Sequence, residues 1–291
     1  MIHAPKTKVE TGKPYNLPLL MPPMTTRIDQ RFADLRAKNE TAFIPYITAG
    51  DPNLESTLER VKLLEAAGAD IIELGIPFSE PLADGVANQR AAERALSAGT
   101  TFSGILDTVR AIRETSEIPL LFFSYLNPLF VRGFEESVKQ AAEAGVDGML
   151  LVDLSLEESA PFSKALAEVG LNHVPLVTPT TPEDRVEGLL KSAGGFVYCV
   201  SRAGVTGEQS ELQKEAQAVL DRARRHTELP VALGFGVSSE EQAKAYAGMS
   251  DGVVVGSYIV NTFHEAGDTP EGRAEAMKKI SPLIQAVKES S

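Results

Sequence analysis

Short apolar runs alternate with longer amphipathic segments from residue 25 onward, and this alternation constrains the fold more than any other feature. Strands that are apolar on both faces and alternate with helices form parallel sheets covered on both sides. Eight such units in a chain of this size predict a closed (β/α)8 barrel. The runs that we expect to form its strands are Phe43–Thr48, Asp70–Gly75, Leu120–Tyr125, Gly148–Asp153, His173–Thr178, Gly195–Val200, Val231–Gly234 and Gly252–Gly256.

An open, doubly wound sheet is the alternative fold of the same α/β class. Such sheets often carry a G-x-G-x-x-G turn after the first strand. In this chain the corresponding turn reads Ala49-Gly50-Asp51-Pro52, which favours the barrel. Asp51 followed by Pro52 also predicts the start of a helix, with an N-cap residue and a proline at the first helical position.

The two ends of the chain differ from the repeating part. Arg27–Lys38 has amphipathic spacing and predicts an extra N-terminal helix that closes the bottom of the barrel. Residues 1–24 contain five prolines and three lysines, and we expect a disordered extension there, with Met24 as a candidate alternative start. No linker-like stretch interrupts residues 25–291, so we expect them to form a single TIM-barrel catalytic domain.

Composition argues against several classes of function. The chain has 40 acidic and 28 basic residues and a net charge of −12, so we expect neither nucleic acid nor a membrane as a partner. The single cysteine, Cys199, excludes an intramolecular disulfide, and the four histidines lack metal-ligand spacing. No apolar run reaches the ~18 residues of a membrane span. A secretory signal pattern is also missing, and we expect a cytoplasmic protein.

One carboxylate stands out because it lies inside an apolar strand. Glu73 occurs in the run Ile71-Ile72-Glu73-Leu74-Gly75, near the carboxyl end where barrels carry their active sites. Burial should raise its pKa, which suits a general acid–base, unless a buried partner satisfies it or the side chain reaches solvent. Asp84, in the loop that follows, is by itself typical of a turn. Its proximity to Glu73 on the same unit makes it the second candidate.

Glycine-rich turns follow the last two strands, at Gly234-Phe235-Gly236 and Gly256-Ser257. Barrels often bind phosphate at these loops through backbone N–H groups and the start of a short helix, for which Tyr258–His264 is the candidate. The loop Ser201–Gly207 has the glycines of a lid, although an ordinary surface loop would have the same composition. Tyr198 precedes it and either faces the mouth of the barrel or packs in the core.

Four motifs, taken together, identify a family. Phe43–Pro52, Glu73–Gly85, Ser201–Gly207 and Leu233–Ser238 resemble the tryptophan synthase alpha subunit, in the family's order and spacing from about residue 26 to the end. The resemblance implies a lyase that cleaves indole-3-glycerol phosphate to indole and glyceraldehyde 3-phosphate without a metal or cofactor. It also implies a beta-subunit partner that uses pyridoxal phosphate and receives the indole through a channel, in an assembly of two alpha and two beta subunits.

The resemblance also implies roles for individual residues. The catalytic pair falls on Glu73 and Asp84. The substrate-binding positions fall on Tyr46, Tyr125, Tyr198, Thr206 and Phe235, and the phosphate-binding positions on Gly207, Gly236, Gly256 and Ser257. The chain departs from the family's usual residues at three places, where Glu80 replaces Asp, Val86 replaces Pro and Ser155 replaces Pro.

Two other functions remain as alternatives at this point. One is a stand-alone lyase that releases indole without a partner, which the changed loop positions motivate. The other is a catalytically weak barrel kept as an allosteric or assembly subunit. Without the resemblance, isomerases or epimerases of phosphorylated sugars on the same barrel would be equally plausible.

Overall fold

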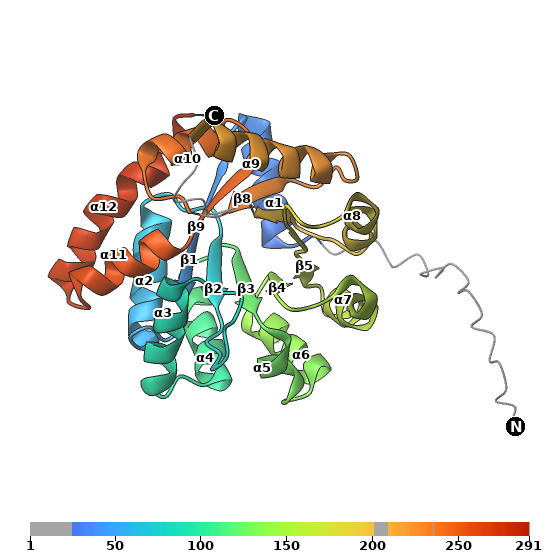
Figure 1. Ribbon diagram of the computed structural model, residues 1–291. Coiled ribbons are helices and arrows are strands. Elements are labelled where there is room, and N and C mark those ends of the chain that lie inside the picture. Colours follow the sequence, from blue (N-terminus) through green and yellow to red (C-terminus); the bar gives the residue numbers. More distant parts are fainter. Residues whose placement is uncertain (1–24, 201–208, 235, 291) are drawn as a thin grey trace, which may run out of the picture.

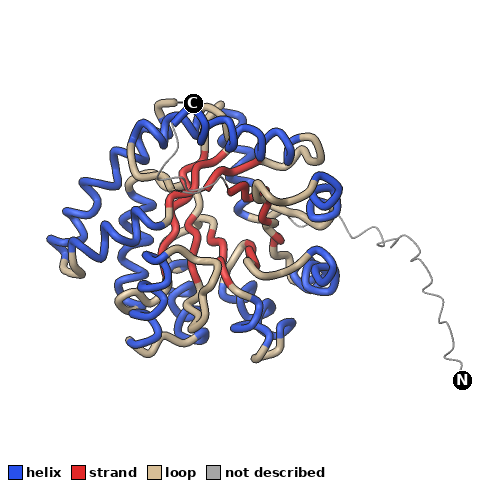
Figure 2. The backbone as a smooth tube through the Cα atoms, in the orientation of Figure 1, coloured by secondary structure: helices blue, strands red, loops and turns tan. Residues whose placement is uncertain are grey.

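The computed structural model describes residues 25–200, 209–234 and 236–290, and in that part of the chain it forms a sheet of parallel strands surrounded by helices (Figures 1 and 2). The strands follow the order β5-β4-β3-β2-β1-β9-β8-β7-β6, and every pair is parallel. They are β1 (Ala42–Thr48), β2 (Ile72–Gly75), β3 (Leu120–Ser124), β4 (Gly148–Leu151), β5 (Asn172–His173), β6 (Leu176–Val177), β7 (Val197–Val200), β8 (Val231–Gly234) and β9 (Gly252–Val255). The prediction for residues 1–24 lies outside the described residues.

The two ends of this sheet, β5 and β6, are consecutive pieces of one strand position. The Val174 N–H donates to Met149 O of β4 at 2.9 Å, and Pro175 O accepts from the Tyr198 N–H of β7 at 3.0 Å. The ring therefore closes around eight strand positions, and the predicted (β/α)8 barrel is confirmed. The prediction of one continuous strand over His173–Thr178 was wrong. Pro175 has no N–H to give to the ladder, so the strand breaks there.

Helices cover the outside of the barrel between successive strands (Figure 1). Most strands are followed by one or two helices, whereas β5 runs directly into β6. The helices are α1 (Arg27–Lys38), α2 (Leu54–Ala66), α3 (Val86–Ser97), α4 (Phe102–Arg113), α5 (Leu126–Phe130), α6 (Phe134–Ala144), α7 (Ser159–Glu168), α8 (Glu183–Leu190), α9 (Gln209–Arg224), α10 (Glu240–Ala247), α11 (Ser257–Ala266) and α12 (Pro270–Lys288), with a short 3-10 helix η1 (Leu156–Glu158).

Helix α1 closes one end of the barrel, as the sequence predicted and with the predicted bounds. Its residues Ile28, Phe32 and Leu35 pack into the cluster of inward-facing strand residues that fills the interior. Phe32 contacts the ring of Phe196 with centroids 5.4 Å apart. Burial of this apolar face, rather than helix propensity, holds the helix in place.

Ion pairs show which end α1 covers. Arg27 donates to Asp147 at 3.0 Å and Arg31 to Asp70 at 3.4 Å. Both aspartates are buried and stand just before β4 and β2. The helix therefore covers the amino ends of the strands and leaves the carboxyl ends for the functional loops.

The predicted role of Asp51 as a helix N-cap was wrong. Helix α2 begins at Leu54, and its N-cap Asn53 accepts from Ser56 N–H. Asp51 is buried instead, and its carboxylate accepts from Nε and Nη2 of Arg94 at 2.7 and 2.8 Å. This bidentate pair ties the loop after β1 to α3, the helix that follows the Asp84 loop.

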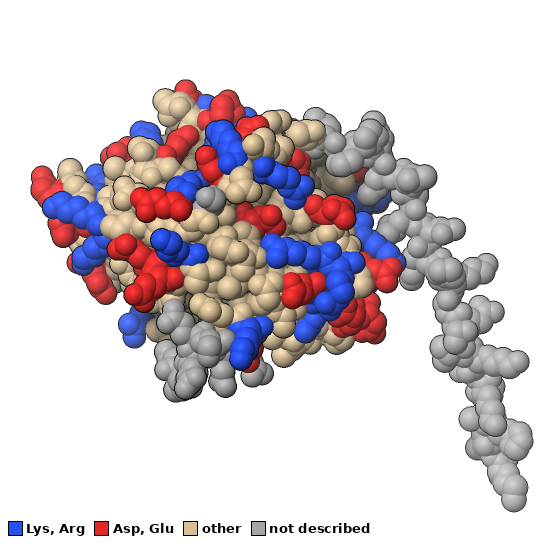
Figure 3. Space-filling view, turned by 90° about the horizontal axis from the view of Figure 1, so that it is seen from above, with Lys and Arg blue, Asp and Glu red and all other residues tan. Residues whose placement is uncertain are grey.

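Acidic and basic side chains are interspersed on the surface, as Figure 3 shows for one face. Among the helices of the described residues, none combines the length and the apolar composition that a bilayer crossing requires.

Candidate active site

Glu73 lies on β2, in register with Tyr46 of β1, and its side chain is buried with 1% of its surface exposed. Its Oε1 has no hydrogen-bond partner among the described residues. Burial raises the pKa of this carboxyl to about 8, and the nearby charge of Asp84 adds to the rise. Glu73 is therefore protonated at neutral pH and able to give up a proton, as a general acid–base must.

Asp84 lies in the loop between β2 and α3 and is held from two sides. The Tyr125 hydroxyl donates to Asp84 Oδ2 at 3.1 Å and accepts from the Ala83 N–H at 2.8 Å. Burial raises the pKa of Asp84, but hydrogen bonds from Tyr125 and Asn88 oppose that rise. Glu73 Oε1, by contrast, has no hydrogen-bond partner in the described part of the chain. The two carboxyls thus differ in environment, which is how one pair comes to hold one acid and one base.

Besides Tyr125, three aromatic side chains lie around the carboxyl pair, and of these Tyr46 and Tyr198 were predicted whereas Phe123 was not. The rings of Tyr46 and Phe123 meet edge to face with centroids 5.5 Å apart. Burial is the main cause that raises the pKa values of Tyr46 and Tyr198, and the charge of Glu73 adds to the rise at both. Both phenols therefore lie close to Glu73. Sequence reasoning missed Phe123, because a phenylalanine in an apolar strand looks like any other core residue.

Two glycines make room for these tyrosines. A Cβ on Gly75 would lie 2.0 Å from the Tyr46 hydroxyl, and one on Gly234 would lie 2.3 Å from the Tyr198 hydroxyl. Each tyrosine therefore crosses directly over the backbone of the neighbouring strand. Only glycine permits so close an approach.

The start of α11 lies beside the Asp84 loop. Gly256 is its N-cap, and Ser257, the first helical residue, is exposed. A Cβ on Gly85 would lie 3.9 Å from Ser257 Oγ, so the turn that carries Asp84 adjoins this helix end. A helix N-terminus offers free N–H groups and a positive dipole, which together favour an anion.

Of the four remaining predicted site residues, the structure describes one, Gly236. Gly236 follows β8 with a φ of +69°, a left-handed conformation that favours glycine. Thr206, Gly207 and Phe235 lie outside the described residues, together with the rest of the predicted lid.

The three departures from the family pattern have local explanations in part. Val86 is the first residue of α3, a position that accepts either proline or an ordinary residue. Ser155 precedes η1, and its hydroxyl donates to the Glu158 carboxylate at 2.9 Å. Glu80 is exposed, and nothing in the structure explains its replacement of aspartate.

Asn88 is a second residue that sequence reasoning missed. It lies in the first turn of α3 and hydrogen-bonds to the Asp84 carboxylate, an interaction that lowers the pKa of Asp84. A polar residue soon after a helix start resembles an ordinary capping residue. The sequence therefore carried no signal that distinguished Asn88 from its neighbours.

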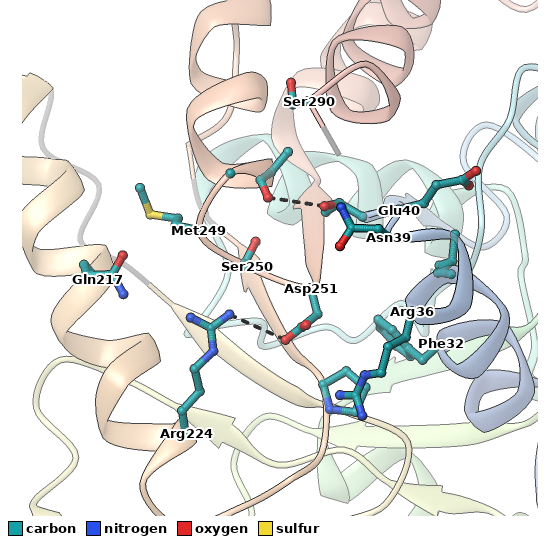
Figure 4. Close-up of a pocket in the computed structure, with 15 residues that line it drawn as sticks. Phe32, Arg36, Asn39, Glu40, Gln217, Arg224, Met249, Ser250, Asp251 and Ser290 are labelled. Carbon is teal, nitrogen blue, oxygen red and sulfur yellow. Dashed lines mark hydrogen bonds and ion pairs between the residues drawn. The ribbon is translucent and has the colours of Figure 1, made fainter.

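A separate hollow of roughly 430 Å³ lies at the opposite end of the barrel, beside α1 (Figure 4). Arg224 and Asp251 pair across it at 3.6 Å, and Arg36 and Glu40 also line it. This is the amino end of the strands, where barrels do not carry out chemistry. Among the described residues, no group of three or more His, Cys, Asp or Glu side chains is arranged to hold a metal ion.

Comparison with known proteins points to one family. Residues 32–289 match the family model described as tryptophan synthase alpha chain. The tryptophan synthase alpha chain of Opitutus terrae is 46% identical over 246 residues, which cover 84% of this chain and 92% of the relative.

Solved structures agree with that match. The tryptophan synthase alpha subunit of Legionella pneumophila superposes with a TM-score of 0.84 and 35% identity, covering 91% of this chain and all of the other. A chain from a structure titled as the tryptophan synthase a2b2 complex of Pyrococcus furiosus has a TM-score of 0.78 and 38% identity, over 84% of this chain and 98% of its own.

Proposed function

Because the chain belongs to the tryptophan synthase alpha chain family, we propose that Glu73 and Asp84 are the residues with which it performs the family's reaction. The chain is a lyase of tryptophan biosynthesis that carries out the alpha reaction, a retro-aldol cleavage. Its substrate is then indole-3-glycerol phosphate, and its products are indole and glyceraldehyde 3-phosphate. The observation that carries the assignment of residues is the buried carboxyl of Glu73, whose Oε1 has no hydrogen-bond partner among the described residues, beside a second carboxyl that is hydrogen-bonded.

The reaction needs two proton movements and no redox step. A proton added to C3 of the indole ring turns it into an indolenine, from which the bond to the glycerol carbon breaks. The hydroxyl on that carbon loses its proton and becomes the aldehyde of glyceraldehyde 3-phosphate. One proton enters and one leaves, so the reaction is balanced without a cofactor.

Glu73 is the group that moves these protons. At neutral pH it is protonated, because burial raises its pKa to about 8, and it can deliver a proton to indole C3. Once ionised, it can take the proton of the glycerol hydroxyl. A positioned acid–base of this kind typically contributes ~10²–10⁴-fold in rate.

Asp84 acts on the other side of the ring. As C3 gains a proton, positive charge develops at the indole nitrogen, and an ionised carboxylate that accepts its N–H stabilises that charge. The hydrogen bonds from Tyr125 and Asn88 favour the ionised form of Asp84. Tyr46, Tyr198 and Phe235 are proposed to surround the ring.

The phosphate is proposed to bind at the start of α11. Gly256 and Ser257 supply its free N–H groups, and the adjacent turn of Gly85 brings this helix end next to the carboxyl pair. Gly207 and Gly236 complete the proposed set, with Thr206 in a lid. Binding energy gained at the phosphate then holds the reacting carbon against Glu73, far from the phosphate itself.

A beta subunit is the partner that the family implies, and we propose an assembly of two alpha and two beta chains. The Pyrococcus furiosus structure is titled as such a complex. Four large apolar residues are exposed near the carboxyl ends of the strands, which supports a protein surface there. They are Leu82, Val86, Phe130 and Val131, with exposed fractions of 86%, 61%, 61% and 70%.

The experiment that tests the proposal measures indole release from indole-3-glycerol phosphate, first by the chain alone and then with an equimolar beta subunit. We expect cleavage by the chain alone and a faster rate with the partner. Full activity that the beta subunit leaves unchanged would favour a stand-alone lyase. No cleavage under either condition, with the substrate bound, would leave only the assembly role.

A further inference from the structure

Among the described residues, three buried side-chain polar atoms lack a hydrogen-bond partner: Arg60 Nε, Glu73 Oε1 and Asn88 Oδ1. Leaving such an atom unpaired destabilises a fold, so each calls for an explanation. The guanidinium of Arg60 is otherwise engaged, because it donates to Asp51 O at 2.6 Å and lies 4.8 Å over the Phe263 ring. Glu73 Oε1 is explained by the reaction. Asn88 Oδ1 is not.

Asn88 lies between the two ends of the proposed substrate site. Its side chain hydrogen-bonds to the carboxylate of Asp84, which faces the indole. A Cβ on Gly256, at the phosphate end, would lie 3.9 Å from Asn88 Nδ2. The amide therefore lies between Asp84 and the start of α11, the two places proposed to hold the indole ring and the phosphate.

The chemistry of the amide defines what can satisfy it. Its nitrogen is the donor that a carboxylate requires, so the nitrogen faces Asp84 and the oxygen is left as an acceptor. A carbonyl oxygen needs an O–H or N–H donor. The linking part of the substrate carries two hydroxyls, and Glu73 takes the one beside the ring.

We propose that Asn88 is a specificity-determining residue, whose nitrogen positions Asp84 and whose oxygen accepts a hydrogen bond from the second hydroxyl of the glycerol phosphate chain. This inference rests on the proposed function. One side chain then couples the orientation of the carboxylate to recognition of the chain that links ring and phosphate.

The test compares two ligands that differ in their hydroxyls. Indole-3-glycerol phosphate carries both, and indole-3-propanol phosphate has the same skeleton without them. Dissociation constants are measured by calorimetry in the Glu73→Gln background, so that binding is observed without turnover. The variants added to this background are Asn88→Ala, Asn88→Asp and the control Glu93→Ala on the exposed face of α3.

Asn88→Ala is expected to weaken indole-3-glycerol phosphate about two- to tenfold more than the propanol analogue, the range of one neutral hydrogen bond. Asn88→Asp keeps an acceptor oxygen, so it should recover most of the affinity for indole-3-glycerol phosphate that Asn88→Ala loses relative to the analogue. Glu93→Ala should leave both dissociation constants unchanged. Equal weakening of the two ligands by Asn88→Ala would overturn the contact with the hydroxyl.

A pH profile of the reaction tests whether the Asn88 nitrogen positions Asp84. With Glu73 intact, both Asn88 variants lose the donor to Asp84, so the acidic limb of kcat/KM should move to higher pH. If the acidic limb of the kcat/KM profile does not move, Asn88 does not position Asp84. If the wild-type chain binds both ligands but releases no indole, the proposed function fails, while the ratio of dissociation constants still decides the role of Asn88.

Discussion

Replacing Glu73 by Gln is expected to stabilise the folded chain at neutral pH, although it removes the proposed catalytic group. Glu73 is buried with 1% exposure, and its pKa is about 8 instead of the usual 4.5, chiefly because of burial. At pH 7 the carboxyl is protonated in the folded chain and ionised in the unfolded chain. Folding therefore has to take up a proton, and that costs free energy.

The sign and size of the effect follow from linkage. Between pH 4.5 and 8 the unfolded state binds fewer protons at this site than the folded state, so the stability contributed by Glu73 falls as the pH rises. Each pH unit is worth about 1.4 kcal/mol, which gives about 3 kcal/mol at pH 7. For a chain of this size that corresponds to roughly 5 °C in Tm. Gln does not titrate, so its contribution to stability does not change with pH.

The assay is urea unfolding of wild type and Glu73→Gln at pH 5 and pH 7, with Glu93→Gln on the exposed face of α3 as the control. A buried Gln amide adds its own cost, but that cost does not vary with pH. The stability difference between the two chains should therefore grow by about 2.5 kcal/mol from pH 5 to pH 7, because a small part of the effect is already present at pH 5. A difference that stays constant would refute the reasoning, since it would mean that Glu73 is ionised when folded.

Three further outcomes follow from the same geometry. Asp84→Asn removes the charge that stabilises the indole nitrogen, and should lower kcat/KM for indole-3-glycerol phosphate about 10- to 100-fold, the value of a hydrogen bond to a charged group. Tyr125→Phe deletes the 3.1 Å hydrogen bond to Asp84, so the acidic limb of the pH–rate profile should move to higher pH; an unchanged limb would contradict this role. Gly234→Ala places a methyl group 2.3 Å from the Tyr198 hydroxyl, and should weaken binding of indole-3-propanol phosphate, measured by calorimetry, with little change in circular dichroism.

The repeating part of the fold could be predicted because it depends on local pattern. Alternating apolar strands and amphipathic helices leave few architectures other than the barrel, and the amphipathic spacing of Arg27–Lys38 gave α1 its correct bounds. Glu73 could also be found this way, because a carboxylate inside an apolar strand contradicts the pattern around it. A residue that breaks a local rule is a good candidate for function.

Most of the features that were missed depend on packing that local sequence patterns do not encode. Asp51 looked like a helix cap, but its partner is Arg94, 43 residues away, and spacing carries no information about such a pair. Pro175 is a different case, because its missing N–H is visible in the sequence, and the break that it makes between β5 and β6 could have been predicted. Asn88 became visible only through an oxygen without a partner, which is a property of packing and not of sequence.

The central claim is that Glu73 moves the protons of the cleavage. The most direct test measures indole formation from saturating indole-3-glycerol phosphate, with a beta subunit present, by wild type, Glu73→Gln and Glu93→Gln. The account predicts that Glu73→Gln lowers kcat by at least ~10²-fold while Glu93→Gln keeps the wild-type rate. A Glu73→Gln chain that still binds the substrate and releases indole within about tenfold of the wild-type rate would contradict the account.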